Sequence, residues 1–210
     1  SASLMTVNAA PQHGLPLGAD SNGFDELGRL MYGGQSSLEL GYLSALIALA
    51  VGVVYGLISG YVGGWLDALM MRFVDIMLSI PGLFLLLAVI AILGRSKMLL
   101  ILFLGLAGWF GNARLMRSEA IALRDREFAQ AVRAMGGSSR RIIFKHILPN
   151  TVSTTLTVAT FAVADSILAL TTLGFLQLGI PLPQTDWGTM IQNGTNNFQL
   201  GYWWQLYPVC

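Results

Sequence analysis

Formal charge is scarce in this chain of 210 residues, because Asp, Glu, Lys and Arg together make up only 11% of it. Soluble domains carry about 25% charged residues, which a water-facing surface needs. Hydrophobic residues reach 54%, and the mean hydropathy is +0.64. The composition therefore predicts a protein whose solvent is the lipid bilayer. A net charge of +1 gives no reason to expect a nucleic-acid partner.

Residues that carry out chemistry are also rare. A P-loop needs Gly-Lys-Ser or Gly-Lys-Thr, but neither of the two lysines, Lys97 and Lys145, follows a glycine. His13 and His146 are far apart and fall on opposite sides of the predicted membrane, and Cys210 is the only cysteine. We therefore expect no enzyme, metal site or cofactor in this chain, and we expect any ATP hydrolysis to occur on another chain.

Long runs without a formal charge predict an all-α membrane protein. A bilayer core about 30 Å thick takes roughly 20 apolar residues in a helix. We predict four transmembrane helices at about 38–62, 72–94, 98–116 and 151–176. The expected organisation is an external segment (1–37), three spans (38–116), a cytoplasmic loop (117–150), a fourth span (151–179), an external loop (180–201) and the start of a further span (202–210).

The distribution of basic residues predicts the orientation of these helices. Residues 114–146 contain eight of the twelve Lys and Arg residues and three acidic ones, so the 114–150 loop is expected in the cytoplasm. Alternation then places 1–37 and 180–201 outside. Four aromatic residues are typical of an outer aromatic belt that introduces a further span: Tyr202, Trp203, Trp204 and Tyr207.

Gly52, Gly56 and Gly60 recur every four residues and mark one face of the first predicted span. Small residues at this spacing favour close helix packing. A narrow point in a transport pathway is the alternative interpretation.

The cytoplasmic loop has the pattern of a capped helical hairpin. Phe128, Ala131, Val132 and Met135 follow the spacing of one apolar helix face, and Gly136-Gly137 is a helix stop. Ser138 and Ser139 can cap a second helix that runs to about His146, and Pro149 is expected to end it. The hairpin either rests on anionic lipid headgroups or docks a cytoplasmic partner.

Two stretches of this hairpin resemble the EAA loop of bacterial ABC importer permeases: 128–136, Phe-Ala-Gln-Ala-Val-Arg-Ala-Met-Gly, and 142–150, Ile-Ile-Phe-Lys-His-Ile-Leu-Pro-Asn. Gln130 stands where the family pattern has Glu, and His146 stands where it has Ile. The resemblance implies that the hairpin couples to an ATPase subunit, through Gln130, Ala131, Val132, Arg133, Met135, Gly136, Gly137, Leu148 and Pro149.

Three further segments, 17–33, 75–81 and 173–188, are similar to the dipeptide, oligopeptide and nickel branch of that family. The resemblance implies a type I ABC importer fold with six spans, of which this chain would lack the first and most of the sixth. It also implies a bacterial inner-membrane location, a second homologous permease, two ATP-binding subunits that carry ATP and Mg, and an external substrate-binding protein. Dipeptides, longer peptides, nickel chelates and glutathione-like molecules are all compatible substrates.

Two acidic residues in the predicted spans are candidate pathway or gate residues, because an acid inside a membrane is expensive. Asp75 lies three residues after Arg72, so we expect a pair that acts as a structural anchor or, alternatively, as a gate. Asp165 either lines the pathway or accepts hydrogen bonds at a helix interface. Thr171 and Thr172 are expected near the same cavity.

Two other classes of function remain open at this point. An ion-coupled carrier or channel usually has several intramembrane charges or broken helices, whereas this chain offers Asp165 and a possible break at Pro81. A non-transporting membrane scaffold is the third class.

Overall fold

The computed structural model describes residues 6–181 and 184–210. Within these residues the regular secondary structure is helical, and the only β interactions are isolated bridges between Gln12 and Leu15 and between Ala19 and Asp25. The predicted all-α class is therefore confirmed.

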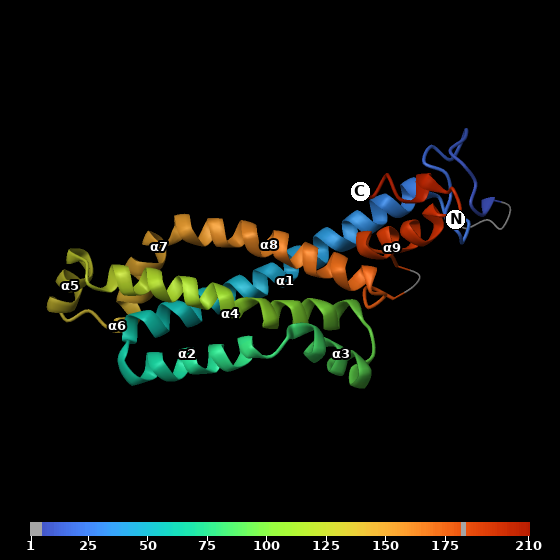
Figure 1. Cartoon of the computed structure of the whole chain (residues 1–210). Helices are drawn as coiled ribbons and strands as arrows, with labels where there is room; N and C mark the ends of the chain where they lie inside the picture. The colour runs from blue at the N-terminus through green and yellow to red at the C-terminus, as the bar shows by residue number, and fades with distance from the viewer. Residues whose placement is uncertain (1–5, 182–183) are drawn as a thin grey trace. The chain divides into compact units, whose positions relative to one another are not determined.

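Three helices are long and apolar enough to cross a membrane: α1 (Glu26–Val62), α4 (Lys97–Arg124) and α8 (Val152–Phe175). Figure 1 shows their order along the chain. The helix α1 begins well before the predicted residue 38, and α4 continues past residue 116 to Arg124.

The span predicted at 72–94 is not one straight helix. Instead, α2 (Gly64–Ser79) and α3 (Gly82–Leu93) meet at an angle of 77°, as a broken span or a re-entrant loop does. Pro81 explains the break, because proline disfavours helical geometry in the residue before it. Ile80 is accordingly extended, with φ −88° and ψ 122°.

The remaining elements are short. They are α5 (Glu127–Ala134), α6 (Ser139–Arg141), a π-helical turn (Ile142–Ile147), α7 (Leu148–Asn150), α9 (Trp187–Phe198) and a 3-10 turn (Trp203–Gln205). The predicted external loop 180–201 thus contains a helix.

The chain forms two compact units. We call residues 43–94 and 102–164 the hairpin unit, and we call the described part of 1–42, 95–101 and 165–210 the terminal unit. The helices α1, α4 and α8 each contribute residues to both.

In the terminal unit, buried polar groups fix irregular backbone. Asp186 caps α9 by accepting hydrogen bonds from the Thr189 backbone N–H at 2.8 Å and its hydroxyl at 2.9 Å. Trp204 donates from Nε1 to the Ala19 carbonyl oxygen at 3.3 Å, and Gln205 is buried. At 202–210, where we predict the start of a further span, the structure has a 3-10 turn.

In the hairpin unit, α1 and α4 pack closely through the three glycines. A Cβ added at Gly52 would lie 2.7 Å from the Asn112 Cβ, and one added at Gly60 would lie 2.8 Å from the Ala120 Cβ. Real Cβ atoms do not approach so closely, so larger residues would separate the helices. The packing interpretation of these glycines therefore holds.

Candidate functional site

The first helix of the predicted hairpin, α5, ends as the sequence predicts. Gly136 adopts a left-handed φ of +78° and donates to the Arg133 carbonyl oxygen at 3.0 Å. Gly137 donates to the Val132 carbonyl oxygen at 2.9 Å. These two hydrogen bonds form a Schellman motif. A Cβ on Gly137 would lie 2.5 Å from the Val132 Cγ1, so the second position also requires glycine.

One face of α5 is buried against the core. Ala129 is fully buried, and Phe128 and Val132 pack against the same core. Ala131 is exposed, and Met135 is 78% exposed. An apolar strip is consequently left uncovered.

A single core cluster attaches α5 to two of the long helices. It joins Val53, Leu57 and Tyr61 of α1, Met116 and Ala120 of α4, Ala129 of α5, and Ile142, Ile143 and Ile147 of the π-helical turn. The hairpin is therefore built on the ends of α1 and α4 and does not hang from a flexible loop.

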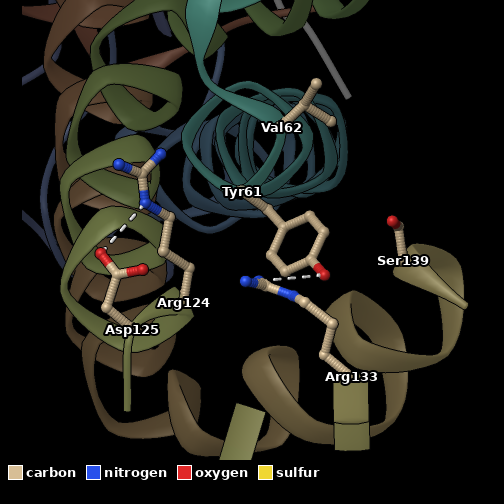
Figure 2. Close-up of a pocket in the computed structure, with 6 residues that line it drawn as sticks. All are labelled: Tyr61, Val62, Arg124, Asp125, Arg133 and Ser139. Atoms are coloured by element: carbon tan, nitrogen blue, oxygen red, sulfur yellow. Dashed lines mark hydrogen bonds and ion pairs between the residues drawn. The ribbon is translucent and has the colours of Figure 1, made fainter. Parts of the chain in front are cut away.

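Arg133 adds a polar attachment to α1. Its guanidinium lies 5.6 Å from the centre of the Tyr61 ring, and its Nη2 donates to the Tyr61 hydroxyl at 3.4 Å. Figure 2 shows both side chains at an open pocket of about 400 Å³, which is also lined by Val62, Arg124, Asp125 and Ser139. Arg133 thus links α5 to the end of α1.

The second half of the hairpin is more continuous than predicted. Ser138 is the N-cap and accepts a hydrogen bond from the Arg141 backbone N–H at 3.4 Å. The helix does not stop before Pro149, because a π-helical turn leads into α7, which contains Leu148 and Pro149. The side chain of Asn150 donates to the His146 carbonyl oxygen at 2.7 Å.

An ion-pair cluster that sequence analysis missed joins α1, α2 and α4 in the same unit. Arg117 donates from Nε and Nη2 to the two carboxylate oxygens of Asp67, each at 2.6 Å. The Ser59 hydroxyl also donates to Asp67. The isolated acid Asp67 after a long apolar run was the available sequence signal, but nothing in the sequence pointed to Arg117 as its partner.

A second ion pair joins α2 and α4. Asp75 pairs with Arg114, so the predicted pairing with Arg72 is wrong. Both side chains are about half exposed, at 50% for Asp75 and 51% for Arg114. The sequence spacing made Arg72 the nearest candidate, but helix packing brings the distant arginine into contact.

The other pathway candidates lie on α8, in the terminal unit. Asp165 is exposed, and no described residue makes a side-chain hydrogen bond or ion pair with it. The Thr171 and Thr172 hydroxyls donate to the Ile167 and Leu168 carbonyl oxygens at 2.8 and 2.9 Å. The threonine hydroxyls are thus satisfied within their own helix.

Several known proteins are similar to this chain. The oligopeptide transport system permease protein OppC of Haemophilus influenzae is 36% identical over 91% of the chain and 62% of its own length. The dipeptide transport system permease proteins DppC of Alkalihalophilus pseudofirmus and Bacillus subtilis are 39% and 34% identical, over 91% and 98% of the chain. The chain spans 62% to 64% of the length of these three relatives.

The fold is also similar to that of a solved chain. A chain in an inward-facing crystal structure of the MetNI methionine ABC transporter matches with a TM-score of 0.69 and 20% identity, over 84% of this chain and 83% of that one. The family described as binding-protein-dependent transport system inner membrane component matches residues 52–207. With most of its length matched by that family and its helices arranged as in an ABC transporter chain, the protein belongs to the binding-protein-dependent transport system inner membrane components.

Proposed function

We propose that this chain is the transmembrane permease subunit of an ATP-driven importer of peptides or related small solutes. It forms the pathway with a second homologous permease and receives solute from an external binding protein. Two separate ATP-binding subunits hydrolyse ATP with Mg. Relatives described as oligopeptide and dipeptide permeases support the substrate class.

The observation that carries this proposal is the way α5 is held. One face of α5 enters the core cluster with α1 and α4, and the Schellman motif fixes its end. A force on α5 is therefore transmitted to two long helices through packed side chains rather than through a mobile loop.

The opposite face of α5 is suited to a protein groove. Gln130, Ala131, Ala134 and Met135 are exposed on it, and three of these four residues are apolar. Methionine adapts to irregular surfaces, and small alanines permit close approach. We therefore assign ATPase docking to this strip, and we assign Val132, Arg133, Gly136, Gly137, Leu148 and Pro149 to positioning it.

The excess of basic residues in 114–150 supports a cytoplasmic location for the hairpin. The ATP-binding subunits of such an importer act on that side, so the charge distribution and the docking role agree. The family description, an inner membrane component, supports a location in the bacterial inner membrane.

The charged residues of the spans mark surfaces that do not face lipid. The Asp75–Arg114 pair is half exposed, and Asp165 is exposed near the middle of α8. Such groups at membrane depth face protein or a water-filled cavity. We propose that Asp165 lines the pathway, with Thr172 exposed about two turns further along α8 and Thr171 beside Gly188 of α9. Separately, within the hairpin unit, we propose that the Asp75–Arg114 pair faces the second permease.

Reconstitution of the complete transporter in proteoliposomes tests the coupling role. Ala131→Arg places a charge on the docking strip, and ATP-driven peptide uptake is expected to fall about tenfold or more because a buried interfacial charge without a partner costs several kcal/mol. Met135→Leu keeps the strip apolar and serves as the matched control, with uptake near that of the unaltered protein.

The amount of inserted permease should be equal in the two variants. Normal uptake by Ala131→Arg would refute coupling through this strip. Uptake that continues after omission of the ATP-binding subunits would refute the ATP-driven importer itself.

A further inference from the structure

The basic residues of the hairpin region fall into two groups. Arg114, Arg117, Arg124 and Arg133 each bind an acidic side chain, a backbone carbonyl oxygen or a tyrosine of the chain. By contrast, no ion pair within the described residues involves Arg126, Arg140, Arg141 or Lys145. The second group therefore presents uncompensated positive charge.

Three members of this second group, Arg140, Arg141 and Lys145, share one surface, which we call the 138–145 patch. Ser138, Arg140, Arg141, Phe144 and Lys145 line an open hollow of about 560 Å³, and none of the five is acidic. Residues four apart lie about one turn apart, so Arg140 is followed by Phe144 and Arg141 by Lys145 on the helix surface. All four side chains are exposed.

The patch lies just before a membrane-spanning helix. The π-helical turn and α7 lead directly into α8, whose first residue is Val152. Val152 and Leu156, one turn apart at the start of α8, are exposed and apolar. Basic side chains at headgroup level, followed by an apolar helix surface, match the two ends of a phospholipid molecule.

We propose that the 138–145 patch binds the headgroup of an anionic phospholipid, such as phosphatidylglycerol, in the cytoplasmic leaflet. Arg140, Arg141 and Lys145 bind the phosphate, and Phe144 contacts the glycerol and upper acyl region. The lipid holds the second half of the hairpin at the membrane surface while the first half, α5, remains free to dock a protein.

Charge and shape favour a lipid over other occupants. A free phosphate needs donors that converge from several sides, whereas this hollow is open and includes an exposed phenylalanine. A protein groove would cover the exposed apolar strip of α5 first, and that strip lies on Gln130, Ala131, Ala134 and Met135. Lipid contact also follows from the patch's position beside α8.

The test uses the complete transporter in nanodiscs of phosphatidylcholine with and without phosphatidylglycerol. A photoactivatable phosphatidylglycerol is the probe, and mass spectrometry maps the labelled residues. We expect label within 138–145, and we expect Arg141→Gln to reduce it about fivefold, as the loss of one basic residue near an anionic surface does. The variant with Arg140→Gln, Arg141→Gln and Lys145→Gln together should lose about tenfold or more.

Arg126→Gln is the matched control, because it removes another exposed arginine outside the patch. Its label should equal that of the unaltered protein. Equal labelling of the Arg141→Gln and Arg126→Gln variants would overturn the proposal, as would loss of label on addition of inorganic phosphate at constant ionic strength. If the triple variant keeps its lipid label but no longer binds the ATP-binding subunits, the lipid proposal is wrong and the patch is an ATPase contact.

Discussion

The Asp67 cluster allows a quantitative test of how the hairpin unit is held together. Asp67→Asn keeps the shape of the side chain but removes its charge. The carboxylate accepts two hydrogen bonds of 2.6 Å from Arg117 and one from Ser59. The amide can accept at one oxygen only, so one guanidinium N–H then faces an NH₂ group.

The degree of burial sets the expected cost. Removal of one partner from a fully buried ion pair costs about 3–5 kcal/mol. The Asp67 side chain is 12% exposed and that of Arg117 is 34% exposed, so water partly hydrates the arginine that remains. We therefore expect a loss of about 2–3 kcal/mol in the free energy of unfolding.

Asp125→Asn is the matched control. Asp125 lies 3.4 Å from Arg124, and its side chain is 68% exposed. An ion pair of that kind contributes about 0–1 kcal/mol, so this variant should unfold almost as the unaltered protein does. Both changes remove one negative charge, and therefore net charge does not distinguish them.

The assay is a double-mutant cycle in detergent, with Asp67→Asn, Arg117→Gln and the combined variant, followed by tryptophan fluorescence during unfolding by SDS. The coupling energy should be about 2 kcal/mol, because both single changes break the same pair. A coupling energy below about 0.5 kcal/mol, typical of independent sites, would refute the view that this pair locks α2 to α4. Equal effects of the Asp67 and Asp125 changes would refute it too.

Three further changes test the packing, the turn and the pathway. Gly56→Val should lower the amount of folded protein measured by size-exclusion chromatography, because the new Cβ would lie 2.8 Å from the Met116 Cβ. Gly111→Ala is the control and should leave that amount unchanged, because no atom lies within 4 Å of its Cβ. Gly136→Ala should destabilise the end of α5 by about 1–2 kcal/mol, because Gly136 has a left-handed φ of +78°. Hydrogen exchange of the backbone amides at the end of α5 should become faster, and an unchanged exchange rate would contradict the prediction. Asp165→Asn should lower peptide uptake severalfold. The amount of inserted protein should stay equal or rise, because a neutral amide costs less free energy at membrane depth than a carboxylate. Reduced insertion would indicate a structural role for Asp165 instead.

Local signals made parts of the structure predictable from sequence. The Gly136-Gly137 stop, the Ser138 cap and the break at Pro81 depend on backbone geometry that one or two residues dictate. The spacing of Gly52, Gly56 and Gly60 predicted close packing without saying which helix would be the neighbour. Charge-free runs located the long helices, because a helix that crosses the bilayer core needs about 20 mainly apolar residues whatever its tertiary contacts are.

Contacts between distant residues were less predictable. Asp75 was paired with Arg72 because only sequence neighbours can be ranked from one sequence, whereas the structure selects Arg114. Asp67 was passed over because its partner lies fifty positions away. Periodicity predicted an apolar strip on α5 but does not say which edge of it the core covers, and Met135 lies on the uncovered edge.

These contacts divide the hairpin unit into parts that move together and a place where bending can occur. The glycine contacts and the core cluster leave little space between α1, α4 and α5, so a push on α5 displaces them as one body. The Asp67–Arg117 pair extends that body to the first turn of α2. Beyond α2 the chain reaches the 77° break at Pro81, where helical hydrogen bonds are already interrupted and a change of angle breaks none of them. A coupling motion would therefore be absorbed where α2 meets α3, far along the chain from the hairpin that receives it.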